Sequence, residues 1–179
     1  MAQEATPFVS MEVVGVRIEM PSNQPIVLLK EIDGIRFLPI WVGSTEAAAI
    51  AFAQQGINPD RPLTHDLMRD LLETLDATLL AVQITHIRDG VFFSTLQLRT
   101  QEDAALSVSA RPSDAIALAL RTSSNIVVAR TLIDEAGIEI PERLIQEMDE
   151  NGDPIENGSA DIEAFREFLD QINPEDFAG

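Results

Sequence analysis

The stretch 61–67, Arg-Pro-Leu-Thr-His-Asp-Leu, holds the densest group of side chains in the chain that can do chemistry. It offers a guanidinium, a hydroxyl, one of only two imidazoles and a carboxylate. Because Pro62 disfavours helix at the residue before it, Arg61 is expected in an extended segment that leads into a helix. Thr64 is expected to cap that helix, with Asp66 stabilised in its first turn by the positive end of the helix dipole.

A shorter version of this arrangement occurs at 111–114, Arg-Pro-Ser-Asp, and an apolar helical run follows it. Each stretch alone fits an ordinary helix N-terminus, because a Ser or Thr cap with an acid in the first turn is common. The two arginines and the histidine beside these helix starts favour a functional interpretation. Arg61 and Arg111 could grip a phosphate together, helped by Thr64, Ser113 and backbone N–H groups, or each could pair with a nearby carboxylate.

His65 and three carboxylates are the candidates for the chemical step. A helix N-terminus disfavours a further positive charge, so His65 is interpreted either as a neutral base or metal ligand, or as a capping histidine. Glu46, Asp66 and Asp114 each fall in the first turn of an expected helix. If the three helix starts converge, their carboxylates would form a Mg²⁺ or Mn²⁺ site; the alternative is that they only stabilise helix dipoles and never meet.

The remaining aromatic and imidazole groups have simpler interpretations. Trp41, Phe92 and Phe93 fall within apolar strand-like runs, so they are expected in the core and not as platforms for stacking bases. His86 sits in a strand beside an Asp-Gly turn and is expected to be structural.

The elements that must position these residues recur in the same order. Three strand-like runs and a helix are followed by a central helix from Thr64, and then by three more strand-like runs and a helix. The expected elements are strands 12–19, 26–30 and 37–42 with helix 46–55, capped by Ser44 or Thr45, and strands 79–87, 91–99 and 105–110 with a helix ending at 121. An offset of 69 residues superposes the two sets. We therefore expect an α+β fold in which a duplicated strand-strand-strand-helix unit forms a mixed, largely antiparallel sheet with helices packed on it, completed by a strand at 125–129.

The composition limits both location and chemistry. The chain has 179 residues, is 45% hydrophobic, and contains no apolar run long enough to span a membrane. The N-terminus lacks the pattern of a signal peptide, so a cytoplasmic protein without a membrane partner is expected. The chain contains no cysteine and two histidines, which excludes disulfides, thiol catalysis and Cys- or His-rich metal sites.

Charge divides the chain into a body and a tail. Residues 1–130 carry 15 acidic and 10 basic residues, whereas residues 131–179 carry 15 acidic and 2 basic residues. The expected organisation is one domain at 9–137 and an acidic helical extension at 138–179, whose apolar stripe is expected to dock on the body or on a sister subunit. A body of net charge −5 offers phosphates no general attraction, so nucleic-acid binding would need a local arginine cluster.

Three motifs, at 38–47, 61–67 and 110–119, resemble the bifunctional nuclease domain family, in the order in which that family has them. The resemblance covers roughly 9–137, and it is greatest to actinobacterial members, which also carry an acidic C-terminal extension. It implies a small, cytosolic α+β protein that hydrolyses phosphodiester bonds, since plant members act on both DNA and RNA. It implies no particular catalytic set.

The residues at the motif positions complete the hypothesis of a homo-oligomeric, metal-assisted nuclease of DNA and RNA. His65 would activate water, and Arg61 and Arg111 would neutralise phosphate charge. The metal ligands would be Glu46, Asp66 and Asp114. Two alternatives stay open: a non-catalytic regulatory or scaffold oligomer, and a protein that binds a small phosphate- or carboxylate-bearing ligand between the two arginines.

Overall fold

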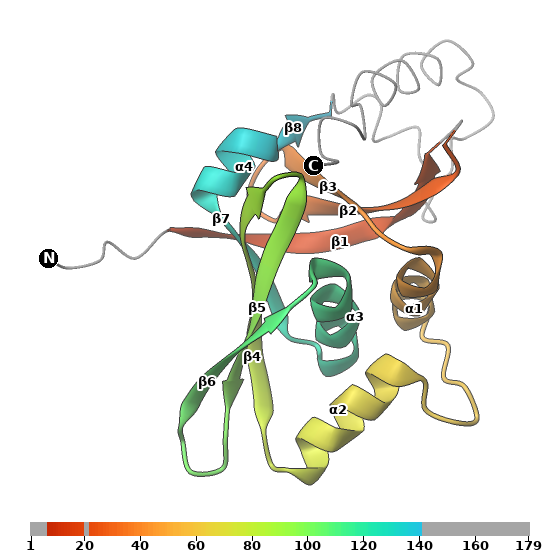
Figure 1. The fold of residues 1–179 in the computed structure, drawn as a ribbon, viewed down its shortest axis with the longest axis vertical. Helices are drawn as coiled ribbons and strands as arrows, with labels where there is room; N and C mark the ends of the chain where they lie inside the picture. Colours follow the sequence, from red (N-terminus) through yellow and green to blue (C-terminus); the bar gives the residue numbers. More distant parts are fainter. Residues whose placement is uncertain (1–6, 20–21, 141–179) are drawn as a thin grey trace, which may run out of the picture.

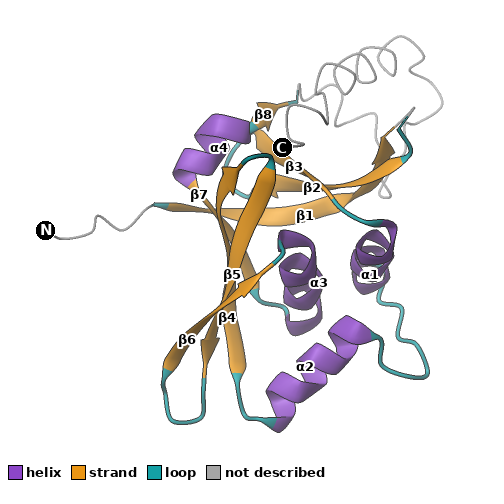
Figure 2. Ribbon diagram, in the orientation of Figure 1, coloured by secondary structure: helices purple, strands orange, loops and turns teal. Residues whose placement is uncertain are grey.

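The computed structural model describes residues 7–19 and 22–140, which form one eight-stranded mixed sheet and four helices (Figures 1 and 2). This confirms the predicted α+β class. The strands are β1 (Phe8–Glu19), β2 (Gln24–Glu31), β3 (Arg36–Trp41), β4 (Thr78–Arg88), β5 (Val91–Arg99), β6 (Ala105–Ala110), β7 (Asn125–Ala129) and β8 (Ile138–Glu139). The helices are α1 (Ser44–Gln54), α2 (Thr64–Thr74), α3 (Pro112–Thr122) and α4 (Arg130–Ala136).

The sheet has the order β6-β5-β4-β7-β1-β2-β3-β8. It consists of two antiparallel three-stranded runs joined by β7, and the short strand β8 is added beside β3. β7 is antiparallel to β1 and parallel to β4. The β4–β5 hairpin turns at Asp89 and Gly90, whose φ angles are 51° and 74°. Two positive φ angles are what a two-residue turn between twisted strands requires, so the hairpin predicted at Asp-Gly is confirmed.

The predicted order of strands and helices occurs in both halves of the chain. β1, β2, β3 and α1 form the first set, and β4, β5, β6 and α3 form the second. The two sets extend outward from opposite sides of β7. That they descend from one duplicated unit stays a prediction.

The helices that carry the candidate site lie together against the sheet, and α3 is the central one (Figure 1). α3 packs on α1, α2, β4, β5 and β7. Its residues 115–119 are all buried, as expected for a helix that is apolar on every side. The core around it draws on both halves of the sheet, so the helix starts are supported by the whole fold.

The helices begin without the hydroxyl caps that the sequence predicted. α1 is preceded by Gly43, so Ser44 is its first residue and Thr45 lies inside it. α2 includes Thr64, and the carboxylate of Asp66 accepts a hydrogen bond from the backbone N–H of Leu63 at 2.9 Å. The predicted caps at Ser44, Thr45 and Thr64 are therefore wrong, because Gly43 and Leu63 occupy the N-cap positions and the three hydroxyl residues lie inside the helices.

The end of the described chain adds a short strand to the sheet. β8 pairs with β3 at Arg36 and Phe37, beyond the domain boundary predicted at residue 137. Arg36 also donates to Glu31 on β2 and to Asp134 on α4, which fastens α4 to this edge. From residue 141 on, the helical extension predicted at 138–179 lies outside the described residues.

Candidate active site

Arg111 joins two carboxylates at the N-terminus of α3. Its Nε donates to Oδ2 of Asp114 at 2.7 Å, and its Nη2 donates to Oε1 of Glu46 at 2.8 Å and to Oδ1 of Asp114 at 3.1 Å. Asp114 also lies 3.0 Å from Nε2 of His65, the second residue of α2. Four of the predicted site residues, carried by three helices, therefore form one hydrogen-bonded network, which we call the Arg111 network.

Gly43 leaves room for the Glu46 carboxylate at the start of α1. Its backbone is extended, with φ −72° and ψ 158°, and it immediately precedes the helix. A Cβ at this position would collide with Oε2 of Glu46. The missing side chain therefore lets Glu46 take up the conformation in which it reaches Arg111.

Asp66 lies outside the Arg111 network and forms a buried ion pair with Arg121. Nε of Arg121 donates to Oδ1 of Asp66 at 2.5 Å, and the side chains are 5% and 13% exposed, respectively. Nη1 of Arg121 donates to the backbone oxygens of Ala49 and Ala117. Arg121 thereby ties α1, α2 and α3 together.

The position of Arg121 on its helix is a sequence signal for this role. Asp114 and Arg121 are seven residues apart, so two turns of helix place them on the same face of α3. Between them the helix is apolar. Charged residues spaced by two turns on an otherwise apolar helix indicate that this face meets polar partners on neighbouring elements.

The charges of the Arg111 network stabilise one another. Burial raises the pKa of Asp114, but hydrogen bonds from Arg111 and His65 outweigh burial and hold that pKa below its ordinary value. The backbone N–H of Glu46 lowers the pKa of its own carboxyl, and Arg111 lowers it further. Asp114 and then Glu46 raise the pKa of Arg111. At neutral pH the network therefore holds two carboxylates and a guanidinium in their charged forms.

Three further predicted residues take no part in these hydrogen bonds. Arg61 and Thr64 are exposed, and Arg61 has no hydrogen bond or ion pair with any residue that the structure describes. Ser113 is buried in the first turn of α3. The expected joint grip of Arg61 and Arg111 is therefore not formed by the side chains as they lie in the structure.

The carboxylates do not fit the predicted divalent metal site. Glu46 and Asp114 both contact Arg111, whereas Asp66 contacts Arg121. Within residues 7–19 and 22–140, no group of three or more acidic or histidine side chains is placed to hold a metal ion. A Mg²⁺ or Mn²⁺ site stays a prediction from the sequence, and no chemical step below is assigned to it.

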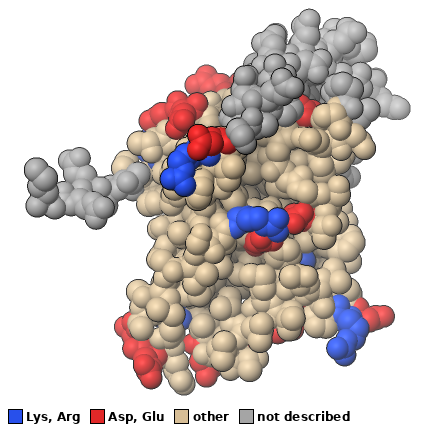
Figure 3. Space-filling model, viewed as in Figure 1, with Lys and Arg blue, Asp and Glu red and all other residues tan. Residues whose placement is uncertain are grey.

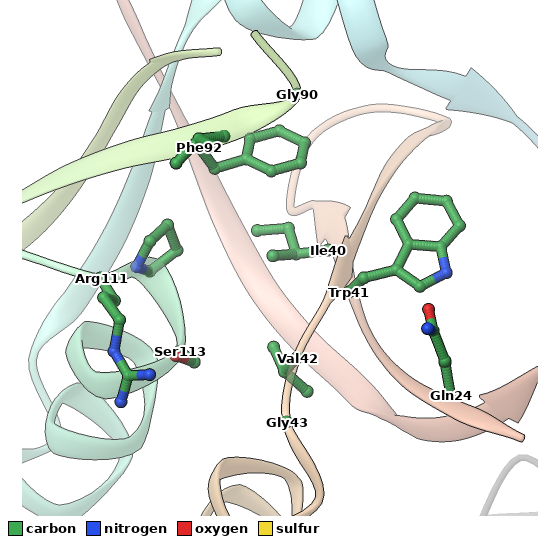
Figure 4. Close-up of a pocket in the computed structure, with 11 residues that line it drawn as sticks. Gln24, Ile40, Trp41, Val42, Gly43, Gly90, Phe92, Arg111 and Ser113 are labelled. Atoms are coloured by element: carbon green, nitrogen blue, oxygen red, sulfur yellow. The ribbon is translucent and has the colours of Figure 1, made fainter. Parts of the chain in front are cut away.

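A cavity of about 400 Å³ lies beside Arg111. Four separate stretches of chain line it: Gln24 at the start of β2, the end of β3 with the residues after it, the β4–β5 hairpin, and the start of α3 with Arg111 before it. Figure 4 shows Arg111 and Trp41 on opposite sides, with Ile40 and Val42 between them. The side chains that line the cavity include Ile40, Trp41, Val42, Phe92, Arg111 and Ser113.

Trp41 and Phe92 do not lie in the fully buried core, contrary to the expectation from sequence. Both are half-buried and line the cavity. The indole N–H of Trp41 donates to Oε2 of Glu19 at 3.2 Å, and the hydroxyl of Ser22 donates to the same oxygen at 2.6 Å. Glu19 is itself buried, so its carboxylate holds the indole in place.

His86 has the structural role that the sequence indicated. Its ring stacks on Phe93 with ring centroids 4.5 Å apart, and its Nδ1 lies 2.9 Å from the hydroxyl of Thr85. Arg88 lies over the same phenylalanine ring, 4.9 Å from its centroid. Phe93 therefore packs against its own hairpin, whereas Phe92, the preceding residue, lines the cavity.

The face of the molecule in Figure 3 offers no broad attraction to a polyanion. Figure 3 shows the Lys and Arg side chains on this face scattered and mostly beside acidic ones, with no continuous basic patch. The body has the acidic balance given above. Phosphate binding would therefore depend on local contacts such as Arg111, whose side chain is 65% exposed.

Comparison with known families decides the classification. The sequence profile of the bifunctional nuclease domain matches residues 27–141, which is more than half of the chain. The chain belongs to the bifunctional nuclease domain family. The match starts inside β2, so β1, which pairs with β2 and β7, extends the sheet beyond the residues that define the family here.

Relatives of this bifunctional nuclease domain fall into two groups. Uncharacterised proteins from two strains of Mycobacterium tuberculosis are 46% identical over 167 residues, covering 93% of this chain and 96% of theirs. Bifunctional nuclease 1 of Oryza sativa subsp. indica is 28% identical over 120 residues, covering 66% of this chain and 36% of the rice protein. The nuclease name thus comes from distant relatives that are longer than this chain.

None of the helices that the structure describes is long and apolar enough to cross a membrane.

Proposed function

We propose that the protein is a nuclease that hydrolyses phosphodiester bonds in DNA and RNA at the cavity beside Arg111. The observation that carries this proposal is the meeting of the three motifs. Residues 40–43 and 111–113 line one cavity, and His65 from the third motif contacts Asp114 beside Arg111. Membership of the family supplies the reaction class, and the site supplies residues that suit it.

Arg111 is the group proposed to bind the phosphate. Its Nε and Nη2 contact Asp114 and Glu46, while its Nη1 has no hydrogen-bond partner among the described residues. The guanidinium can therefore donate to a phosphate oxygen without giving up the carboxylates that orient it. A fixed positive charge at this position would stabilise the charge that develops on the phosphoryl oxygens in the transition state.

The Asp114–His65 pair is proposed to move the proton. Asp114 is the more accessible member, with a side chain 26% exposed against 7% for His65. When water attacks phosphorus, the pair takes the proton that water loses and returns one to the departing oxygen as the P–O bond breaks. Hydrogen bonds from Arg111 and His65 keep Asp114 ionised, so the carboxylate orients the imidazole and His65 is the member that carries the proton.

Binding of a small anionic ligand without cleavage is the second candidate. The cavity volume lies in the range of small-molecule sites, which runs from about 300 to 1,000 Å³. The hydrogen bonds of the Arg111 network also join α1, α2 and α3. Their presence would be explained if the network only stabilised the packing of these helices. In that case the protein would bind a phosphate- or carboxylate-bearing molecule and act as a regulatory or scaffold protein.

Cleavage of end-labelled single-stranded DNA and RNA by highly purified protein tests the proposal. The wild type is compared with Asp114→Asn and His65→Gln, and with His86→Gln as a matched control, because His86 is the other histidine and lies outside the cavity lining. We expect cleavage by the wild type and by His86→Gln. Loss of acid–base catalysis should slow the two site variants by roughly 100-fold or more.

Equal cleavage by all four proteins would assign the activity to a contaminant or to another site. No cleavage by any of the four proteins would move the conclusion to the second candidate. Each reaction is run with Mg²⁺, with Mn²⁺ and with EDTA, and activity that disappears only in EDTA would return the predicted metal to the mechanism. Circular dichroism of each variant separates lost chemistry from lost folding.

A further inference from the structure

The cavity beside Arg111 combines an aromatic wall with a cationic edge. Trp41 and Phe92 are both half-buried there, and Ile40 and Val42 fill the space between Trp41 and Arg111 (Figure 4). A simple anion would not pack on the aromatic side chains, and a wholly apolar ligand would form no ion pair with Arg111. The lining therefore fits a molecule with a flat apolar part and an anionic part.

The side chain of Trp41 is pre-organised in the absence of a ligand. The indole N–H of Trp41 is bonded to the buried carboxylate of Glu19, which also accepts from Ser22. This contact engages the polar atom of the indole and fixes the orientation of the side chain beside the cavity. Binding on an aromatic side chain that is already fixed loses little conformational entropy, which favours affinity.

The guanidinium of Arg111, which forms the cationic edge of the cavity, has one nitrogen available to donate to a ligand. Nη1 of Arg111 has no hydrogen-bond partner among the described residues, and the guanidinium stays charged because Asp114 and Glu46 raise its pKa. A nucleotide carries a flat base and a phosphate joined by a sugar, so it matches both parts of the cavity. A base can present its face to an aromatic side chain only when it is unpaired and unstacked.

We propose that this cavity is a base-binding subsite that takes one unpaired base of a single-stranded nucleic acid against Trp41 and Phe92, with the adjoining phosphate on Arg111. The inference rests on the proposed nuclease function and specifies its substrate class. Because every base has an aromatic face, such a subsite selects single strands over duplexes without selecting a sequence, and it accepts both DNA and RNA.

The protein carries its own probe for this subsite. Trp41 is the single tryptophan and the chain has no tyrosine, so intrinsic fluorescence excited in the near ultraviolet reports on the cavity. The full chain is titrated with a dT12 oligonucleotide, with an abasic strand of the same length, and with thymidine monophosphate. We expect dT12 to change Trp41 fluorescence, and the abasic strand to bind more weakly by about five- to 100-fold, the range that base–aromatic stacking supports.

Two neighbouring phenylalanines give matched variants. Phe92→Leu keeps an apolar side chain but removes the ring from the cavity, whereas Phe93→Leu removes a ring that stacks on His86. Phe92→Leu should weaken dT12 binding by several-fold or more, and Phe93→Leu should leave it unchanged. Equal binding of dT12 and the abasic strand by the wild type would overturn the subsite, even if Phe92→Leu failed to fold.

The outcomes separate the subsite from the nuclease function. A change in Trp41 fluorescence without cleavage would uphold the subsite and refute the nuclease. Cleavage with no fluorescence change, and with Phe92→Leu as active as the wild type, would uphold the nuclease and refute the subsite. Thymidine monophosphate binding as tightly as dT12 would overturn a single strand as the occupant, in favour of a free nucleotide.

Discussion

Asp66 stabilises the fold through two contacts that its sequence position does not reveal. Its carboxylate accepts from Nε of Arg121 and from the backbone N–H of Leu63. Burial raises the pKa of the Asp66 carboxyl, but the Arg121 hydrogen bond and then the Leu63 hydrogen bond outweigh it and leave the pKa below its ordinary value. A lowered pKa means that folding favours the charged carboxylate.

The sign of the pH dependence follows from that direction. The stability that Asp66 contributes is fully present above the pKa of an unfolded aspartate, about 4, and is lost as the pH falls through the lower, folded value. We expect Asp66→Asn to lower the free energy of unfolding by about 3 kcal/mol or more at pH 7, because it leaves Arg121 buried and unpaired. The difference between the two proteins should shrink below about pH 4.

Urea denaturation at pH 7 and at pH 3 measures this difference. Asp70→Asn is the matched control, since Asp70 lies on the same helix and pairs with Arg69 near the surface, where an ion pair contributes about 1 kcal/mol or less. A loss for Asp66→Asn that is the same at both pH values would show that the carboxylate charge is not what stabilises the pair.

At this scale, four of the eight candidate residues chosen from the sequence lie together in the Arg111 network, and their roles in a site stay predictions. Arg111, Asp114, Glu46 and His65 were all selected from helix starts, and the structure brings them together. Asp66 was placed with them because it too begins a helix. Which acid meets which arginine depends on how far apart the packed helices lie, and no local pattern encodes that distance.

Strands and helix interiors were more predictable than the ends of helices. The strand at 125–129 has the predicted bounds. An apolar run of β-branched residues between polar residues indicates both that a strand forms and where it begins and ends. The predicted caps at Ser44 and Thr64 failed because α1 and α2 each begin one residue earlier than expected, with Gly43 and Leu63 at the N-cap positions.

The C-terminal end of α3 gives a prediction at the scale of an element. Ser123 has φ 53° and ψ 36°, the left-handed conformation in which a side chain costs about 1 kcal/mol relative to glycine. Its side chain is exposed. We expect Ser123→Gly to raise the free energy of unfolding by about 0.5–1 kcal/mol, measured by thermal and urea denaturation.

The adjacent serine is the control. The hydroxyl of Ser124 donates to the backbone oxygen of Leu79, so it links the end of α3 to β4. Ser124→Gly should lower the free energy of unfolding by about 1 kcal/mol, because it removes this hydrogen bond. Equal effects of the two substitutions would mean that backbone conformation does not govern the end of the helix.

At the scale of the whole molecule, α2 presents an apolar stripe to solvent. Leu67, Leu71 and Leu75 follow one another at helical spacing and are 51%, 50% and 70% exposed. Leu106 and Val108 on β6, the outermost strand of the described sheet, are also exposed. The homo-oligomer expected from the sequence stays a prediction, and these residues are the surface at which we expect it to form.

Leu71→Lys tests that expectation. A charge in the middle of the stripe should convert the oligomer to a monomer, as measured by light scattering after size-exclusion chromatography, because burying an unpaired ammonium group is costly. Glu73→Lys is the control, since Glu73 lies on the same helix with a side chain 72% exposed. A monomeric wild type would contradict the prediction outright.

The central place of β7 has a consequence for how the protein is made. Residues 125–129 sit between β1 and β4, so the two three-stranded runs cannot be joined until almost all of the described chain has left the ribosome. Until then β1 and β4 are open strand edges, which other chains can pair with. Assembly of the sheet is therefore dominated by contacts distant in sequence, and the nascent chain is most vulnerable to aggregation in the period before β7 emerges.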